Sequence, residues 1–219
     1  MSTWKMSTSE LRSRPIERPT RERILYEAAE LFARQGYHGT TTREIADAVG
    51  IRQPSLFHHF PTKGAMVEAL LEWDLGVALP RVYVIARQPD SPAVRLYRYL
   101  HADVTHLATA PYNLGGVYTE EVIGSPEFAA WARRRSELHD VVERIVREGI
   151  DSGAFVRMDA NMVRQAIGGI LVRVITMYSG GRGTADALAD EVARLLVRGL
   201  LVDPNRLEDV ARRALTNSA

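Results

Sequence analysis

The sequence predicts an all-α fold, in which a three-helix helix-turn-helix domain precedes a larger helical body. Apolar residues recur at spacings of three and four along most of the 219 residues, as they do on the buried face of an α-helix. Serine, threonine or aspartate stands before several of these segments, where a helix N-cap is expected. Residues 82–85 have the composition of a strand, but no partner strand is found elsewhere, so we interpret residues 80–92 as a helix end and a loop.

Composition narrows the class of protein. A chain of 219 residues is long enough for a small domain followed by a larger one. It contains no cysteine, which excludes disulfides, thiolate metal sites and thiol catalysis. There is no run of about 18 apolar residues and no apolar stretch typical of a secretory signal near the first residue, so we expect neither a membrane span nor export. The expected location is the cytoplasm.

Residues 1–19 are expected to be a disordered basic arm. They are polar and show no apolar period. Their arginines are Arg12, Arg14 and Arg18. A polar tail without a role is the interpretation that we favour, and a contact with the minor groove of a nucleic acid is the alternative.

A first helix is predicted over residues 20–35. Thr20 is a suitable N-cap, and Gly36 is a suitable end because glycine tolerates the backbone conformation found there. The residues between them carry an apolar stripe at helical spacing: Ile24, Leu25, Ala28, Leu31 and Phe32. We expect this stripe to form a small core with the next two helices.

Two short helices follow, separated by a tight turn. Thr41 and Glu44 have the spacing of a capping box, in which the hydroxyl and the carboxylate each satisfy a backbone N–H. Gly50 ends this helix, and a second helix begins near Gln53 with Pro54 at its first position, where no N–H is needed. The inward-facing side chains are Ile45, Ala46, Val49, Leu56 and Phe60.

Two short helices joined by a glycine turn form a helix-turn-helix, whose second helix lies in the major groove of DNA. Gln53 can read adenine, Ser55 can act as donor or acceptor, and Arg43 can reach guanine or a phosphate. The candidate DNA-binding residues are Thr41, Thr42, Arg43, Arg52, Gln53, Pro54, Ser55, Phe57, His58, His59 and Lys63. An ordinary helical hairpin with solvated polar residues is the alternative that spacing alone leaves open.

Residues 21–71 resemble the DNA-binding domain of the TetR (tetracycline repressor) family of bacterial transcription regulators. The matching residues keep one unbroken register: Ile24-Leu25, Ala28-Ala29, Leu31-Phe32, Gly36-Tyr37, Thr40-Thr41, Glu44-Ile45-Ala46, Gly50-Ile51, Leu56-Phe57, His59-Phe60 and Lys63. Two positions depart from the family pattern. Phe57 stands where tyrosine is usual, which removes a hydroxyl, and His58 stands where an aromatic residue is most common.

The resemblance implies a ligand-responsive, DNA-binding regulator that acts as a homodimer on a pseudo-palindromic operator. We expect residues 20–66 to form the DNA-binding domain and residues 67–219 the ligand-binding and dimerisation domain. The charge distribution agrees with this division. The first 63 residues carry three more basic than acidic residues, and the remainder carries two more acidic than basic residues.

Further helices are predicted in the remainder of the chain from caps and apolar stripes. One begins near Thr62 and fades between Gly76 and Pro80. The others cover residues 91–108, 116–123, 125–150, 160–179, 184–201 and 204–215. The predicted caps include Ser91, Ser125 and Asp159.

The helix over residues 160–179 is apolar on nearly every side in its second half, and such a helix is buried on every side. In a body of this size, one of those sides should meet another subunit. The resemblance to TetR likewise implies that the last two long helices form a four-helix interface with their copies. The candidate interface residues are Ile167, Ile170, Val174, Leu188, Val192, Leu196 and Leu200.

An effector cavity is expected among the predicted helices that begin near Thr62 and cover residues 91–108, 125–150 and 160–179, because helical bodies bind small molecules between helices. The candidates to line it are large side chains near core stripes, several of them with one polar atom: Trp73, Tyr97, His101, Tyr118, Trp131 and Met177. Such a set favours a mostly apolar ligand with a few polar groups. The alternative is that each is a plain core residue whose polar atom is satisfied.

Other classes of function find less support. The sequence lacks a zinc-protease helix, a nucleophile elbow and a phosphate loop, so we expect no enzyme and assign no catalytic residue. His101, Asp103 and His106 are too irregularly spaced to share one helix face, so no metal site and no cofactor are expected. An adaptor that kept the helix-turn-helix without using it would not need Arg43 and Gln53. The leading interpretation is a repressor that releases its operator when a small, mostly apolar effector binds.

Overall fold

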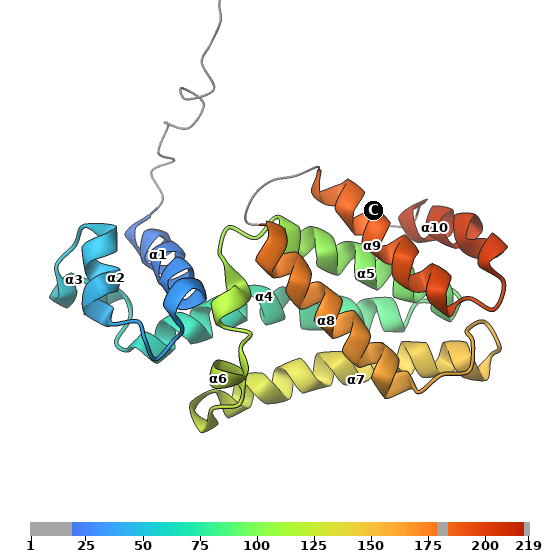
Figure 1. The fold of residues 1–219 in the computed structure, drawn as a ribbon, viewed down its shortest axis with the longest axis horizontal. Coiled ribbons are helices and arrows are strands. Elements are labelled where there is room, and N and C mark those ends of the chain that lie inside the picture. Colours follow the sequence, from blue (N-terminus) through green and yellow to red (C-terminus); the bar gives the residue numbers. More distant parts are fainter. Residues whose placement is uncertain (1–18, 179–183, 217–219) are drawn as a thin grey trace, which may run out of the picture.

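The computed structural model describes residues 19–178 and 184–216, which form α-helices joined by loops and short 3-10 turns (Figure 1). The predicted all-α class is confirmed. The α-helices are α1 Thr20–Gln35, α2 Thr42–Val49, α3 Gln53–His59, α4 Lys63–Ala86, α5 Pro92–Ala108, α6 Glu120–Ile123, α7 Ala129–Asp151, α8 Ala160–Tyr178, α9 Ala185–Leu200 and α10 Leu207–Thr216. The 3-10 helices are η2 Leu114–Gly116, η3 Pro126–Phe128 and η4 Pro204–Arg206. Within the described ranges, β-structure is limited to one bridge between Phe155 and Leu201.

Helices α1, α2 and α3 form a small head at one end of the molecule (Figure 1). The residues predicted to meet behind the motif are buried: Phe32, Ile45, Leu56 and Phe60. Burial of these side chains supplies the free energy that helices of seven and eight residues, such as α3 and α2, need to stay folded. The predicted core of the head is therefore confirmed.

The start of α1 differs from the prediction. Pro19 occupies the N-cap position, and Thr20 is the first helical residue, with no side-chain capping bond. The carbonyl of Pro19 accepts hydrogen bonds from the N–H groups of Glu22 at 2.9 Å and Arg23 at 3.1 Å, so the first turn closes without a capping hydroxyl. Residues 1–18, which make up nearly all of the predicted basic arm, lie outside the described residues.

Helix α4 is longer than predicted and runs through Pro80 to Ala86. The predicted end between Gly76 and Pro80, and the loop that was to follow it, are wrong. Proline removes one helical hydrogen bond and normally kinks or ends a helix. Here Pro80 is exposed, so water can bond the carbonyl that it leaves free, whereas Ala78 and Val82 are buried against the body and hold the helix in place. The long α4 carries the chain from the head into the body.

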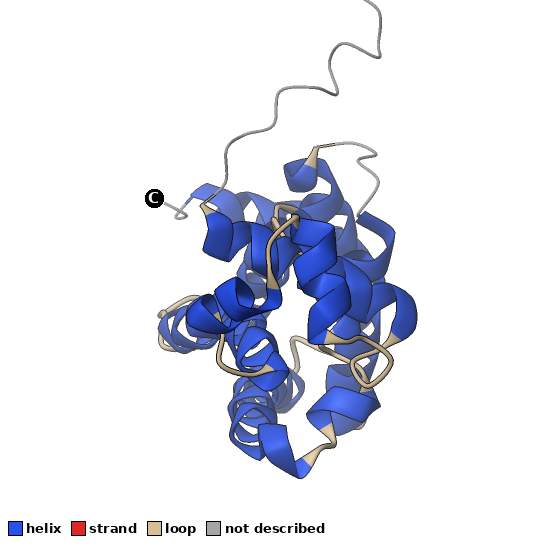
Figure 2. Cartoon of the chain, turned by 90° about the vertical axis from the view of Figure 1, so that its left-hand side faces the viewer, coloured by secondary structure: helices blue, strands red, loops and turns tan. Residues whose placement is uncertain are grey.

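Helix α5 lies at the centre of the body and packs against α4, α7, α8, α9 and α10. Ser91 caps it as predicted, accepting a hydrogen bond from the N–H of Val94 at 3.4 Å. Its predicted core stripe is buried and consists of Leu96, Leu100, Val104 and Leu107. Figure 2 shows the molecule turned so that the head faces the viewer.

The segment between α5 and α7 touches the head. η2 packs against α1, and a Cβ at Gly116 would lie 2.4 Å from the carbonyl carbon of Phe32. Only glycine permits this approach of two backbones. The contact fixes the position of the body relative to the DNA-binding motif.

The last long helices begin as predicted. Asp159 caps α8 through a 2.8 Å hydrogen bond from the N–H of Met162 to its Oδ1. Thr184 caps α9, accepting from the N–H of Ala187 at 3.3 Å. In the described part of the chain, no helix is both long and apolar enough to cross a membrane.

Candidate functional site

The two motif helices meet through the predicted turn. The N–H of Glu44 donates to Oγ1 of Thr41 at 3.2 Å, and the N–H of Thr41 donates to Oε2 of Glu44 at 2.8 Å, which confirms the capping box. The Thr41 hydroxyl and backbone N–H both bond the carboxylate and lower the pKa of Glu44. Gly50 ends α2 with φ 75° and ψ 36°, in the left-handed region that glycine adopts without strain. α3 begins at Gln53, so Pro54 is its second residue, not its first.

Apart from Lys63, which begins α4, the candidate DNA-binding residues lie at the start of α2 or in and just before α3. The exposed members are Thr41, Arg43, Arg52, Pro54, Ser55, Phe57 and His58, whereas Thr42, Gln53, His59 and Lys63 are half-buried. Phe57 has 42 % of its surface exposed. An exposed aromatic ring among donors suits contact with a thymine methyl group or a sugar.

Gln53 is held in place by the helix in front of it. Its Nε2 donates to the hydroxyl of Thr42 at 2.8 Å, a hydrogen bond that crosses from α3 to α2. A side chain fixed in this way loses less rotamer freedom when it bonds a base edge. Thr42 therefore positions the residue that is expected to read adenine.

Lys63 lies in a different environment from the one that the sequence indicated. Its ammonium donates to the backbone carbonyls of Tyr37 at 2.6 Å and Thr40 at 2.7 Å, and it lies 4.3 Å from the centre of the Tyr37 ring. Burial lowers the pKa of Lys63. The amine closes the loop between α1 and α2, which points to positioning of the motif as its first role.

Two carboxylates of the body accept hydrogen bonds from that same loop. Oε1 of Glu121 accepts from the N–H of His38 at 3.0 Å, and Glu127 accepts from the hydroxyl of Tyr37 at 3.3 Å. A Cβ at Gly64 would lie 2.2 Å from Oε1 of Glu127, so the carboxylate also packs directly on the first turn of α4. The segment that carries α6 and η3 therefore bonds the head at two points.

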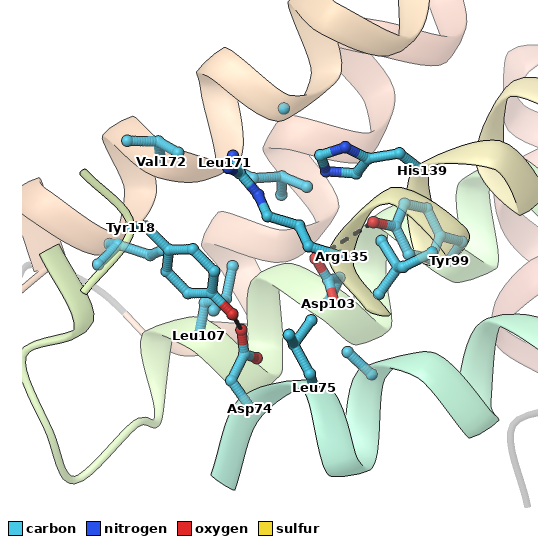
Figure 3. A pocket seen from close by; sticks show the side chains of 14 residues that line it. Asp74, Leu75, Tyr99, Asp103, Leu107, Tyr118, Arg135, His139, Leu171 and Val172 are labelled. Atoms are coloured by element: carbon cyan, nitrogen blue, oxygen red, sulfur yellow. Dashed lines mark hydrogen bonds between the residues drawn. The ribbon is translucent and has the colours of Figure 1, made fainter. Parts of the chain in front are cut away.

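A cavity of about 60 Å³ lies inside the body, among α4, α5, α7 and α8 (Figure 3). These are the helices among which an effector cavity is predicted. Its apolar lining consists of Leu75, Ala78, Leu107, Leu138, Leu171, Val172 and Ile175. Its polar lining consists of Asp74, Tyr99, Asp103, Tyr118, Arg135 and His139.

Two buried carboxylates face this cavity. Asp74 accepts a hydrogen bond from the hydroxyl of Tyr118, and its Oδ1 lies 3.1 Å from Nε2 of His106. Asp103 accepts one long hydrogen bond, of 3.4 Å, from the hydroxyl of Tyr99. Burial, together with the charge of Asp74, raises the pKa of Asp103 to about 7. The cavity therefore combines an apolar wall with two acidic groups.

The predicted effector-binding residues are not brought together. Tyr118 lines the cavity. Trp73 instead stacks on His106, with ring centres 4.4 Å apart, outside the cavity lining. Trp131 lies under the guanidinium of Arg134, whose central carbon is 4.7 Å from the ring centre.

Two further candidates tie α5 to α9. The hydroxyl of Tyr97 donates to Asp190, and Nε2 of His101 lies 3.3 Å from Oδ1 of Asp186. Neither Tyr97 nor His101 lines the cavity. Met177 belongs to α8, but its side chain falls outside the described part of the structure.

Sequence reasoning missed the acidic residues of the cavity. Asp74 follows Leu70 and Leu71 on the buried stripe of α4, and Asp103 lies between Leu100 and Val104 on that of α5. Burying a carboxylate on an apolar helical stripe costs free energy unless the carboxylate is hydrogen-bonded. An acidic residue on such a stripe was therefore the feature of the sequence that could have indicated the site. His101, Asp103 and His106 diverge to different partners, and no group of three or more metal-ligating side chains is found among the described residues.

The predicted dimer residues divide into two groups. Ile167, Val174, Val192 and Leu200 are buried within the subunit's own core, and Ile170, Leu188 and Leu196 are half-buried. The exposed apolar side chains nearby are Met158, Met162 and, with 68 % of its surface exposed, Leu195. Together they border a shallow apolar groove between α8 and α9.

Comparison with known proteins covers both parts of the chain. The family described as "Bacterial regulatory proteins, tetR family" matches residues 24–70, and the "Tetracyclin repressor-like, C-terminal domain" family matches residues 89–200. The HTH-type transcriptional repressor KstR2 of Rhodococcus jostii (strain RHA1) is 28 % identical over 190 residues, which are 82 % of this chain and 90 % of that protein.

Solved structures give the same result. AmtR of Mycobacterium smegmatis is 29 % identical with a TM-score of 0.74, over 93 % of this chain and 97 % of that one. The ketosteroid transcriptional regulator KstR2 of Mycobacterium tuberculosis is 25 % identical with a TM-score of 0.70, over 84 % of this chain and 96 % of that one. The matched families and relatives are regulators of transcription, not enzymes. With both its head and more than half of its length matched, this chain belongs to the tetR family of bacterial regulatory proteins.

Proposed function

We propose that this DNA-binding, ligand-responsive regulator is a repressor, which leaves its operator when a small molecule occupies the cavity lined by Asp74, Asp103 and Tyr118. Its relative KstR2 is named a transcriptional repressor. The site of action is the cytoplasm, where the operator DNA lies. Residues 20–66 serve as the DNA-binding domain and residues 67–219 as the effector and dimerisation domain, with α4 continuous across the boundary.

One observation carries the proposal: a single short segment contacts both the cavity and the head. Tyr118 faces the cavity and bonds Asp74. Three residues later, Glu121 bonds the backbone of His38, and Glu127 then bonds Tyr37. A ligand that displaces Tyr118 therefore shifts the two carboxylates that hold the loop before α2.

Because the cavity is small, an effector is expected to bind an opened form of the protein more tightly than the form described here. At about 60 Å³ the cavity is smaller than the roughly 300–1,000 Å³ of typical ligand pockets. An effector therefore has to part the lining helices, and it binds the parted form more tightly than the form described here. Only such a difference in affinity can move the equilibrium between two states. AibR, a protein of this fold with 21 % identity and a TM-score of 0.58, has been solved in complex with isovaleryl coenzyme A and operator DNA.

A homodimer places two copies of α3 on one DNA duplex. Met158, Met162 and Leu195 expose apolar surface along α8 and α9, which a second copy of the same face would cover. Half-sites for such a dimer are spaced by roughly 34 Å, one turn of the duplex, or slightly more. The operator is therefore a pseudo-palindrome.

The proposal is tested by release of DNA. An operator is first selected from a random DNA pool, labelled, and bound to the protein, and a library of hydrophobic metabolites is then added while fluorescence anisotropy is recorded. We expect some compounds to release the operator from the natural protein. Tyr118→Phe, which loses the bond to Asp74, should need a different concentration of the same compound. If no compound alters DNA binding, or if every releasing compound acts equally on a head lacking the body, the proposed switch is wrong.

A further inference from the structure

We infer that the effector of the repressor proposed above carries a positively charged nitrogen on a short apolar body, and that the carboxylate of Asp103 receives this group. An alkylammonium or amidinium compound has this chemistry. The inference rests on the proposed function for its regulatory consequence, but the binding site itself stands on the geometry of the cavity.

Asp103 is a buried acid that lacks adequate partners. The residue is only 7 % exposed, and Figure 3 shows its carboxyl inside the cavity, between Tyr99 and Arg135. Its one hydrogen bond, from Tyr99 to Oδ2, is 3.4 Å long. No described residue donates a hydrogen bond to its other oxygen. A buried carboxylate in this condition gains strongly from an added N–H donor.

Asp74, the second acid of the cavity, accepts a hydrogen bond through only one of its oxygens, because Oδ1 is buried without one. Its two oxygens contact the hydroxyl of Tyr118 and Nε2 of His106, respectively. It therefore adds negative potential beside Asp103, and its Oδ1 is free to accept a second N–H of the same cation. Both carboxylates attract a cation, and Asp103, whose one hydrogen bond is long, is the first acceptor.

The positive groups around the cavity are turned to other partners. Arg81 of α4 donates to the carbonyl of Ala102 at 2.9 Å. The guanidinium of Arg135, on α7, lies over the ring of Tyr118, 5.4 Å from its centre, and points away from Asp103 (Figure 3). Burial lowers the pKa of His139 to about 4, so this imidazole is uncharged near neutral pH. An anionic effector would thus meet two carboxylates and one guanidinium.

The remaining walls define the rest of the ligand. Among the side chains of α8 that the structure describes, those that line the cavity are Gly168, Leu171, Val172 and Ile175. A Cβ built at Gly168 would meet no atom within 4 Å, so the space beside α8 can accept a short hydrocarbon chain or be filled by a larger side chain. The carboxylate of Asp103 and the apolar wall formed by α8 together suit a small amphipathic cation.

The test uses three probes of equal length and different charge: n-butylammonium, n-butanol and butyrate. Each is titrated into the full-length protein by calorimetry at about pH 8, where Asp103 is ionised. We expect butylammonium to bind, and butyrate and butanol to bind at least about tenfold more weakly. Asp103→Asn should weaken butylammonium at least about tenfold, whereas Asp151→Asn, an exposed acid at the end of α7, should leave it unchanged.

A second variant keeps the test decisive if Asp103→Asn does not fold. Gly168→Leu fills the space beside α8 without changing charge and should also abolish binding of butylammonium. Equal binding of the three probes, preference for butyrate, or unchanged affinity in both variants overturns the inference.

Measuring release of operator DNA separates the proposed switch from binding of the cation. Butylammonium that binds in an Asp103-dependent way and also releases DNA supports both proposals. Binding without release supports the cation site and contradicts the proposed switch. Release by a neutral or anionic compound that acts equally on Asp103→Asn supports the switch and overturns the inference.

Discussion

The hydroxyl of Tyr37 donates to the carboxylate of Glu127, 3.4 Å from one oxygen and 3.3 Å from the other, and joins the head to the body. Burial, the charge of Glu127 and this hydrogen bond raise the pKa of Tyr37 to about 12, so the phenol remains a proton donor at any physiological pH. The same ring packs on Lys63. The contact therefore couples the loop before α2 to the segment that carries Tyr118.

Tyr37→Phe should weaken this coupling without unfolding the head, because the ring and its packing on Lys63 remain. Loss of one hydrogen bond should cost about 0.5–1.5 kcal/mol in stability. The concentration of effector needed for half-release of operator should change by severalfold. Tyr83→Phe is the matched control, since Tyr83 bonds Glu137 between α4 and α7, away from the head. Equal shifts in the two variants would show that the Tyr37 contact carries no special coupling.

Gln53→Ala should lower operator affinity by about 1–3 kcal/mol and relax the preference at one base position. Thr42→Val should cause a smaller loss at the same position, because it frees Gln53 without removing its amide. Competition binding against single-base variants of the operator measures both effects. Arg157→Ala, an exposed arginine of the body, serves as control and should change neither quantity. A uniform loss across all sequences after Gln53→Ala would assign this residue to the phosphate backbone instead.

Asp103 gives the folded protein a pH dependence of definite sign. Its pKa is about 7 in the folded chain, against an ordinary value of 3.8. Since the folded state holds the proton more tightly, the stabilisation is fully present below pH 3.8 and is lost as pH rises to about 7. Converted at about 1.36 kcal/mol per pH unit, this loss amounts to at most about 4 kcal/mol.

Asp103→Asn should abolish that loss, so its stability relative to the natural protein should rise between about pH 4 and pH 7. Urea unfolding of both proteins across this range measures the difference. His139, whose lowered pKa has the opposite effect on the pH dependence, is present in both proteins and cancels. Parallel pH profiles would show that Asp103 titrates like an exposed carboxyl.

Leu195→Asp should dissociate the dimer while leaving each subunit folded, because the side chain is 68 % exposed within the subunit. Burying an unpaired carboxylate in an interface costs several kcal/mol. Val84→Asp, on the outer face of α4 with 63 % of its side chain exposed, is the control and should remain dimeric. Sedimentation velocity distinguishes the two states. A stable dimer of Leu195→Asp would place the interface elsewhere.

The sequence predicts the head better than the body, for a physical reason. Thr41, Glu44 and Gly50 act through backbone bonds to their near neighbours, so their spacing alone predicts the capping box and the turn. The course of α4 past Pro80 depends on burial of Val82 against helices far away in the chain. Local signals favour a helix end there, and tertiary packing overrides them.

The lining of the cavity was also beyond what local sequence signals could predict. Tyr97 and His101 pair with Asp190 and Asp186 of α9, whereas Asp103, on another side of α5, lines the cavity. Which side of a buried helix faces a cavity is decided by the helices that surround it, and periodicity does not supply this information. The sequence shows Asp74 and Asp103 as acidic residues within apolar stripes. It does not show that α4 and α5 bring the two carboxylates to the same cavity.

The most direct test of the central claim is selection of bound sequences from a random DNA pool, followed by binding of the enriched site over a range of salt concentrations. We expect a pseudo-palindrome with half-sites roughly 34 Å apart or slightly more, bound with an affinity that falls steeply as salt rises. Gln53→Ala should lose the base preference but keep the salt dependence. A pool that yields no common site, or binding indifferent to both salt and Gln53, would contradict the account.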